Sequence, residues 1–345
     1  DWGRALSVTH PGGASASVSY NNHGQVLSAT DEASRVSSYT YDDAGRQTSF
    51  TNGRSDVESY GYNSVHFLTS VTNGRGKTRT YTYTNRGEVA SLTMPDSTVE
   101  SWTYNAEGQE TGFTNGAGQY IQYSYDDAGQ ATGVDYPSGT ADTSFAYDNA
   151  GRVTQMVDGT GSTSWVYDAA GQISSLTQPQ GTLTYTYNTA GQRTAQSGAG
   201  QSQSWTFNSS NGRLTSQTND LGETTSFLYD SLGRLQKKTF SPGNYEAYTY
   251  DSRGRVSTIK LQNSSNAVVL DHTYTYDASS KVATYKRGSV TTTYGYDGAG
   301  QLTSESRSGY SASYTYDGNG NRLTRTVGGS TESYSYDDGD KLLSV

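Results

Sequence analysis

The chain lacks cysteine altogether, contains only five prolines and two methionines, and carries little charge of either sign. Without cysteine there are no disulfides and no thiolate metal sites. The 24 basic residues are scattered and outnumbered by 33 acidic ones, which argues against nucleic acid as a partner. No apolar run approaches the ~18 residues that a membrane-spanning helix needs, so no membrane insertion is expected.

Glycine and tyrosine are abundant instead, with 40 and 30 copies in 345 residues. Tyr, Thr and Val favour strands, whereas Gly, Asn and Asp favour the turns between strands. The composition therefore predicts an all-β fold.

One short pattern recurs along the chain, and YTYDDAGR at 39–46 is an example. We count sixteen copies, whose second aromatic residue runs from Tyr20 to Tyr336 in steps of 20–22 residues, with one step of 26. Such a fixed period is typical of repeat proteins. DWGR at 1–4 matches the end of a further copy. We therefore expect a single array over residues 1–345, truncated or continued at both ends.

The two aromatic residues of each copy are two positions apart, so on a strand they share one face. These positions hold 25 of the 30 tyrosines and three of the four tryptophans. Successive copies should stack their rings into two ladders. The expected structural aromatics include Tyr39, Tyr41, Tyr123, Tyr125, Trp165, Tyr167, Tyr248, Tyr250, Tyr314 and Tyr316.

After the second aromatic come Asp or Asn and, three residues later, usually Gly, which is the pattern of a type I turn closed by a left-handed residue. The expected turn residues include Asp42, Gly45, Asp126, Gly129, Asp168, Gly171, Asp251, Gly254, Asp317 and Gly320. His66, Asn211, Ser280 and Asp340 replace the glycine in four copies. Beside Asn211 and Asp340 stands another glycine, so we expect a shifted turn there, and the weakest turns at His66 and Ser280.

After the turn, apolar residues fall two and five positions beyond the glycine, and this gap of three predicts a bulge in the return strand. A second turn then closes the repeat, with TNG at 51–53, 72–74 and 114–116 and DG at 158–159. All five prolines, including Pro11, fall in second turns. Each copy is thus one β-hairpin, giving ~32 strands, and so long an antiparallel sheet should spiral into a shell, barrel or tube.

The units Y-x-Y-D-x-x-G-[RQ]-[LV], such as Tyr248 to Val256 and Tyr39 to Arg46, resemble the YD repeat of the Rhs family and of the related shells in insecticidal toxin complexes and teneurins. The resemblance covers nearly the whole chain. It implies a spiralling antiparallel sheet that forms a hollow shell, which in bacterial members encloses a C-terminal toxin and in animal members serves cell-surface adhesion. No Asp-Pro occurs here, so the self-cleaving core segment of bacterial toxin shells is not visible.

Several patterns resemble catalytic or metal sites. The pairs Asp42–Asp43, Asp126–Asp127 and Asp337–Asp338 resemble acid/base dyads, and DGNGN at 317–321 resembles a calcium loop without its final glutamate, since Gly328 stands there. His10, His23, His66 and His272 lack metal-ligand spacing, with His23 and His66 the pair most plausibly in contact. A turn residue in ten copies is better explained by structure, so we expect no catalytic, metal or cofactor site and no enzyme.

We therefore expect a non-enzymatic scaffold, a segment of YD-repeat wall from a secreted or cell-surface bacterial protein. Its partners would be a protein cargo or neighbouring subunits, including head-to-tail self-association. The alternative is an extracellular filament or adhesin that binds carbohydrate or a partner surface. Carbohydrate contact would then fall to exposed aromatic rings, for which the candidates are Trp102, Trp165 and Trp205.

Overall fold

The computed structural model describes Arg4, residues 6–10, Gly13 and residues 15–345. Asp1, Trp2 and Gly3 of the partial repeat, and Pro11, lie outside the described residues. Within the part that is described, no helix has the length and hydrophobicity needed to cross a bilayer.

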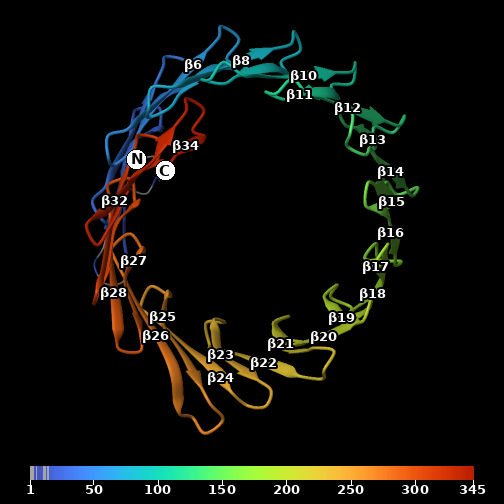
Figure 1. Ribbon diagram of the computed structural model, residues 1–345, viewed down its shortest axis with the longest axis vertical. Helices are drawn as coiled ribbons and strands as arrows, with labels where there is room; N and C mark the ends of the chain where they lie inside the picture. The colour runs from blue at the N-terminus through green and yellow to red at the C-terminus, as the bar shows by residue number, and fades with distance from the viewer. Residues whose placement is uncertain (1–3, 5, 11–12, 14) are drawn as a thin grey trace. The chain divides into compact units, whose positions relative to one another are not determined.

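Strands follow one another along the chain and are joined by short turns (Figure 1). The strands of the first half are β1 Ser7–Thr9, β2 Ser15–Tyr20, β3 Val26–Thr30, β4 Val36–Tyr41, β5 Gln47–Thr51, β6 Val57–Tyr62, β7 Leu68–Thr72, β8 Thr78–Tyr83, β9 Val89–Thr93, β10 Val99–Tyr104, β11 Glu110–Thr114, β12 Tyr120–Tyr125, β13 Ala131–Asp135, β14 Thr143–Tyr147, β15 Val153–Asp158, β16 Gly161–Tyr167 and β17 Ile173–Gln178. Those of the second half are β18 Gly181–Tyr187, β19 Arg193–Gly198, β20 Gln201–Phe207, β21 Leu214–Thr218, β22 Thr224–Tyr229, β23 Leu235–Phe240, β24 Tyr245–Tyr250, β25 Val256–Gln262, β26 Val268–Tyr276, β27 Val282–Arg287, β28 Val290–Tyr296, β29 Leu302–Arg307, β30 Tyr310–Tyr316, β31 Arg322–Val327, β32 Ser330–Ser333, β33 Ser335–Tyr336 and β34 Leu342–Ser344.

The all-β prediction is confirmed, because β1 to β32 belong to one 32-stranded sheet and β33 pairs with β34 in a second. The chain forms two compact units. Unit 1 comprises Asp1–Val99, Thr249–Lys260 and Leu270–Val345, and unit 2 comprises Glu100–Tyr248 and Leu261–Val269.

Each repeat is an antiparallel hairpin with the same register. In β4 and β5 of unit 1, Tyr39 lies opposite Phe50 and Tyr41 opposite Gln47, while Thr40 lies opposite Ser49. Thr48 is therefore an extra residue in the return strand, and the predicted bulge is confirmed. The same shift occurs in β16 and β17 of unit 2, where Tyr167 lies opposite Ile173.

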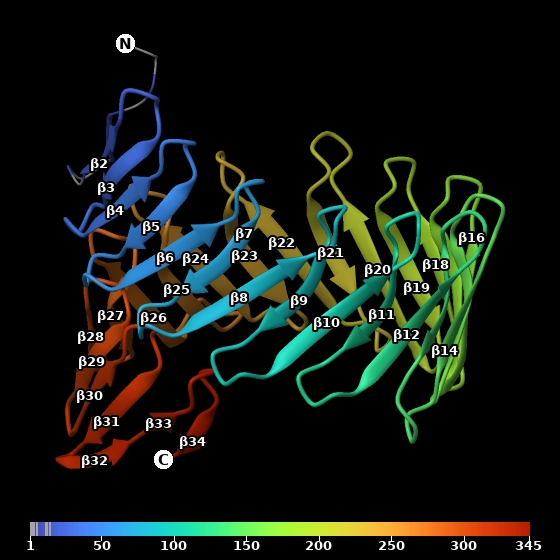
Figure 2. The same cartoon turned by 90° about the horizontal axis from the view of Figure 1, so that it is seen from above.

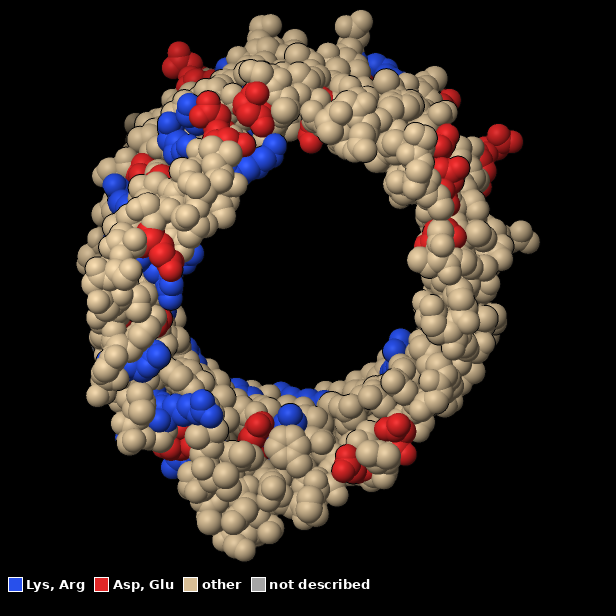
Figure 3. All heavy atoms as spheres, in the orientation of Figure 1, with Lys and Arg blue, Asp and Glu red and all other residues tan. Residues whose placement is uncertain are grey.

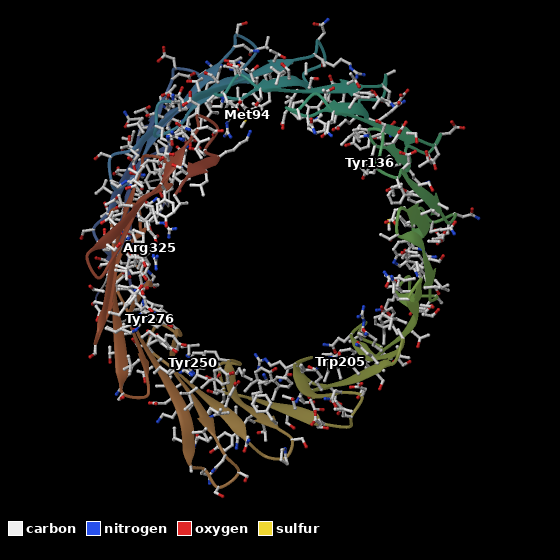
Figure 4. The ribbon with its side chains drawn as sticks, viewed as in Figure 1. Met94, Tyr136, Trp205, Tyr250, Tyr276 and Arg325 are labelled. Atoms are coloured by element: carbon white, nitrogen blue, oxygen red, sulfur yellow. The ribbon has the colours of Figure 1, made fainter. Side chains whose placement is uncertain are left out.

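The register gives the sheet two unlike faces. The aromatic face carries the two aromatic residues of each repeat and the residues opposite them, such as Tyr39 and Phe50. The hydroxyl face carries the intervening serines and threonines, which pair across strands, as in the 2.6 Å contact of Thr40 Oγ1 with Ser49 Oγ. Figure 4 shows Tyr250 and Tyr276 of unit 1 projecting to the same side of the sheet.

Almost nothing is fully buried, because the sheet is a single layer. Among the described residues only Val71, Gly112, Thr163, Tyr245, Thr292 and Ala312 fall in the buried class, and the repeat aromatics stay half-buried. A tyrosine suits such a face, since its ring packs against neighbours while its hydroxyl reaches a polar partner. Stability must then come from contacts between neighbouring hairpins.

The second turns are of two kinds. In the turn at 52–55, Asn52 N–H donates to Asp56 O (3.0 Å) and Ser55 N–H to Asn52 O (2.9 Å), the same pattern as in the first turns. The left-handed residue is Ser55 (φ 70°), not Gly53. Several later repeats use two-residue loops instead, as between Gln178 and Gly181, although the turns at 219–222 and 263–266 keep the first pattern.

The four copies without the usual glycine keep the turn. His66 and Ser280 adopt φ of 71° and 66° and still donate the closing hydrogen bond. Near Asn211 the predicted shift is correct, since Gly212 takes the left-handed position and bonds Asn208 O at 2.8 Å. At Asp340 the prediction is wrong, because Asp340 itself takes φ 66° and Gly339 does not.

Candidate functional site

The aspartate of the first turn is fully engaged in holding that turn. Asp42 Oδ1 accepts from Ala44 N–H (3.0 Å) and Arg46 N–H (2.9 Å), and Oδ2 pairs with the Arg46 guanidinium at 2.6–2.7 Å. The hydrogen bond from the Arg46 side chain lowers the pKa of Asp42 below its usual value, as do those from the backbone. Gly45 closes the turn with φ 79°.

The other turn aspartates bond in the same way. Each accepts two backbone N–H groups, two and four residues ahead, at 2.8–3.0 Å: Asp126, Asp168, Asp251 and Asp317. The glycines that follow them are left-handed: Gly129, Gly171, Gly254 and Gly320.

The paired aspartates do not form dyads in the structure. Asp43 and Asp127 are exposed, whereas the turn aspartates that precede them bond the backbone of their own turns. Asp338 pairs instead with Lys77 at 2.7 Å. Because the two members of each pair face different partners, the arrangement offers no shared proton.

The candidate metal ligands are dispersed among separate partners. Asp317 of the DGNGN stretch bonds its own turn, His10 pairs with Glu32 at 2.9 Å, and His272 Nδ1 lies 2.7 Å from Tyr285 Oη. His23 and His66 lie in different first turns, one of which follows β2 and the other β6. Among the described residues, no three His, Cys, Asp or Glu side chains are placed to hold a metal ion.

The second tyrosine of each repeat ties its hairpin to the preceding one. Tyr41 Oη donates to Val26 O at 2.9 Å. Burial raises the pKa of this phenol above its usual value. Tyr125, Tyr167 and Tyr316 donate to the equivalent carbonyl at 2.6, 2.7 and 2.8 Å. These hydroxyls thus satisfy a backbone acceptor at the start of a neighbouring strand.

The residue after the turn glycine covers the tyrosine of the next repeat. The repeat pattern did not predict this contact. The Arg46 guanidinium lies 4.7 Å from the ring centre of Tyr62, and Arg152 lies 4.4 Å from Tyr167. Where this residue is Gln, its amide reaches the next turn, as Gln25 Nε2 donates to Gly45 O at 2.7 Å. The expected ring-on-ring ladder is therefore corrected for these positions, since a cation lies between successive second rings.

The first aromatics contact the residue opposite them in the same hairpin. Tyr39 lies 5.4 Å from Phe50 between ring centres, and Trp102 lies 5.4 Å from Phe113. Tyr248 Oη instead donates to Glu246 Oε2 of its own strand at 2.5 Å. Tyr123, Trp165 and Tyr314 lie opposite Val134, Leu176 and Arg325.

A second set of contacts joins hairpins that are far apart in the sequence. Within unit 1, β4 to β6 lie beside β27 to β29 (Figures 1 and 2). Four second turns meet four first turns about 245 residues further along, and each pair is one repeat beyond the last. We call this contact the seam, and its turns are 31–34 with 277–280, 52–55 with 297–300, 73–76 with 317–320, and 94–97 with 337–340.

Two arginines link the seam turns in a staggered way. Arg54 lies 3.4 Å from Asp297, donates to Gln301 Oε1 at 2.8 Å and reaches the carbonyl of Asp317. One repeat later, Arg75 lies 3.3 Å from Asp317 Oδ2 and 2.6 Å from Asp340 Oδ1. Each arginine thus joins one early turn to two late ones.

These arginines occupy the place that an internal arginine has elsewhere. In the turn of Asp42, Oδ2 pairs with Arg46, the residue after the glycine. In the seam turns that residue is Gln301 or Asn321, and the aspartate faces an arginine from the distant hairpin. The sequence gives no distinct signal for this exchange, because Gln stands at the same position in copies outside the seam, such as Gln25 and Gln130.

Glycine allows the seam turns to touch by their backbones. A Cβ on Gly53 would lie 2.5 Å from the carbonyl oxygen of Gly298, although Gly53 has no left-handed φ that would require glycine. Gly74 and Gly318 approach each other in the same way. Any side chain at these positions would therefore separate the turns.

Charges of both signs gather at the last seam turn, over the β33–β34 hairpin (Figure 3). The hydrogen bond with Asp340 raises the pKa of Arg75. Burial pushes the pKa of Asp340 upwards, but hydrogen bonds from Arg75, Asn321 and Asn319 outweigh it and lower that pKa. A cavity of about 180 Å³ beside this turn is lined by Lys77, Asp338 and their neighbours.

Two protein-family models match the chain. One, described as the teneurin YD-shell, matches residues 3–181 and 262–345, about three quarters of the chain. The other, described as the RHS repeat, matches residues 167–203 and 209–241. The chain belongs to the teneurin YD-shell family. A search of curated proteins gave no significant match.

Solved structures share the fold of this YD-shell chain. A crystal structure of TcdB2-TccC3 is 14% identical with a TM-score of 0.78, and one of TcdB2-TccC3-Cdc42 is 13% identical with a TM-score of 0.78. In each case the alignment covers 96% of this chain and 23% of the other. The chain thus spans less than a quarter of the length of these proteins.

The three candidate carbohydrate-binding tryptophans of this YD-shell segment lie in unlike surroundings. Trp102 and Trp165 face the apolar side chains of Phe113 and Leu176 across their hairpins. Trp205 faces Gln217. The structure therefore separates three residues that the sequence pattern treats alike.

Proposed function

We propose that the chain is a non-enzymatic segment of a YD-shell wall that encloses a protein cargo. The family match over about three quarters of the chain carries this proposal. The fold shared with TcdB2-TccC3 supports it. We also propose that the parent protein is secreted, which fractionation of the native producer would test.

The contacts suit a wall better than a reactive site. In turn aspartates such as Asp42, both oxygens accept hydrogen bonds from backbone and arginine partners. In tyrosines such as Tyr41, the hydroxyl donates to a backbone carbonyl. Polar groups engaged in this way hold the sheet in shape and leave little capacity for proton transfer.

The seam gives the wall a second direction of cohesion. Hydrogen bonds between strands join each hairpin only to its neighbours, whereas Arg54 and Arg75 join hairpins about 245 residues apart. An enclosing wall needs both kinds of contact, since rows that are not joined would let a cargo escape.

Limited proteolysis of the parent protein tests the proposal. We expect an enclosed segment that resists protease in the wild type and becomes sensitive when Arg54 and Arg75 are both changed to Ala. Asp220→Ala, at an exposed turn position in unit 2, serves as the control and should leave protection intact. Rapid cleavage of that segment in the wild type would overturn the enclosing role, and equal resistance in the double variant would show that the seam is not what closes the wall.

A further inference from the structure

The aromatic face of unit 2 changes character along its length. From β10 to β18 the residues opposite the first aromatics are apolar: Phe113, Val134, Met156 and Leu176. From β18 to β23 they are polar: Gln196 faces Tyr185, Gln217 faces Trp205 and Lys238 faces Phe227. Aromatic rings and hydrogen-bonding groups therefore alternate only in the second part.

A cavity lies in this second part. Its volume is about 540 Å³, within the ~300–1,000 Å³ range of ligand pockets, and its lining includes Gln217, Thr225, Phe227, Lys238 and Phe240. Each of these side chains is half-buried and open to solvent on one side. The lining thus combines aromatic rings with amides, hydroxyls, the ammonium group of Lys238 and the carboxylate of Glu223.

We propose that this strip, from Tyr185 across Trp205 and Phe227 to Lys238, binds a linear oligosaccharide. A pyranose ring presents C–H groups on its faces, which pack on aromatic rings, and hydroxyls on its rim. A side-chain amide both donates and accepts, so it matches a hydroxyl in either role. The lining holds the opposite charges of Lys238 and Glu223, and the uncharged side chains of Gln196, Gln217 and Thr225 can bond neutral hydroxyls.

The spacing fits a repeating ligand. Tyr185, Trp205 and Phe227 lie on β18, β20 and β22, with one strand between each pair. Two strand spacings are ~9.6 Å, which is close to the length of two sugar residues in an extended chain. Every second sugar would then stack on a ring, while the glutamines between them meet the hydroxyls of the others. Trp205 projects from the same side of the unit 2 sheet as Tyr136 (Figure 4).

Titration with defined oligosaccharides tests the site. The probes are cellohexaose, maltohexaose, xylohexaose and mannohexaose, followed by calorimetry and tryptophan fluorescence on the whole chain. We expect at least one to bind the wild type and to quench fluorescence. Trp205→Ala and Gln217→Leu should each weaken its binding at least tenfold, because they remove a stacking ring and an amide.

Trp165→Ala is the matched control, since Trp165 holds the same repeat position but faces Leu176. It should leave affinity unchanged. Failure of all four sugars to bind the wild type would overturn the proposal, and so would equal loss of affinity in Trp165→Ala and Trp205→Ala. Neither result would bear on the enclosing role, which is tested separately by proteolysis of the seam variant.

Discussion

Replacing Gly53 with alanine should open the seam. The new Cβ would lie 2.5 Å from the carbonyl oxygen of Gly298, whereas carbon and oxygen normally approach no closer than about 3.3 Å. The two turns must therefore separate by roughly 0.8 Å. Arg54 already lies 3.4 Å from Asp297, so the same movement would take this ion pair near the limit of contact. Forcing atoms into a close-packed contact costs about 1–3 kcal/mol.

Hydrogen exchange measures this loss at the seam itself. The amides of Ser55 and Gly300 close the two facing turns by bonding Asn52 O and Asp297 O. A cost of about 1–3 kcal/mol corresponds to about 5- to 150-fold faster exchange if the turns open together. Amides of unit 2 should exchange as in the wild type.

The intrinsic difference between glycine and alanine in such a turn needs a control away from the seam. Asp220 is exposed and holds the equivalent position in the turn at 219–222 of unit 2. Comparing Asp220→Gly with Asp220→Ala gives that difference directly. If Gly53→Ala speeds the exchange of the Ser55 and Gly300 amides by no more than this difference, the close backbone approach is not what makes Gly53 necessary, and the reasoning fails.

Four further predictions concern single side chains. Arg75→Ala should lower the free energy of unfolding by about 2 kcal/mol, since it removes charged hydrogen bonds. In urea unfolding, added salt should reduce the difference in this free energy between the variant and the wild type. Burial and the hydrogen bond with Glu58 raise the pKa of Tyr60 to about 12. The neutral phenol therefore stabilises the fold below pH 10, and this contribution disappears as pH rises towards 12. Absorbance at 295 nm should show that Tyr60 ionises later than a free tyrosine. Ionisation of Tyr60 near pH 10 in the folded protein would contradict the prediction. Tyr83→Phe should lower the free energy of unfolding by about 1 kcal/mol, because it loses a hydrogen bond to a backbone carbonyl. Phe207→Tyr should raise stability, because Phe207 is the second aromatic residue of its repeat and lacks the hydroxyl. No change in either variant by calorimetry would refute the role of these hydrogen bonds. Gln301→Arg should supply Asp297 with an internal arginine, displace Arg54 and speed exchange of the seam amides, whereas unchanged exchange would show that the two arginines do not compete.

The hairpin could be predicted from the sequence because its determinants are local. The spacing of Tyr39 and Tyr41 fixes a shared face, and Asp42 with Gly45 fixes a turn. The gap of three in the return strand indicated the bulge that the structure places at Thr48. Each of these features depends on residues within one repeat, so the same prediction could be made independently from each of the sixteen copies.

The seam could not be predicted in this way. Which turns meet across about 245 residues depends on small twists accumulated over many strands, and no local pattern encodes that sum. Gly53 and Gly74 were noticed only as part of Asn-Gly turn signals, yet the left-handed positions fall at Ser55 and Gly76. A turn glycine that the turn does not require is thus the trace that a backbone contact leaves in sequence.

The repeat and the seam use the same aspartate for different purposes. In the turns of Asp42, Asp126 and Asp317, Oδ1 accepts two backbone N–H groups, which leaves Oδ2 for a further partner. Where Arg46 supplies that arginine, the turn is complete within its own repeat. Where Gln301 or Asn321 stands instead, Arg54 or Arg75 from a hairpin of the distant row pairs with the carboxylate, and at Asp317 it shares Oδ2 with the amide of Asn321, which donates at 2.9 Å. The residue after the turn glycine does not decide this alone, since Gln130 bonds Asp126 within its own turn. A repeat joins the distant row where its aspartate also meets an arginine from a facing second turn, and this is how nearly identical hairpins build a wall that holds together in two directions.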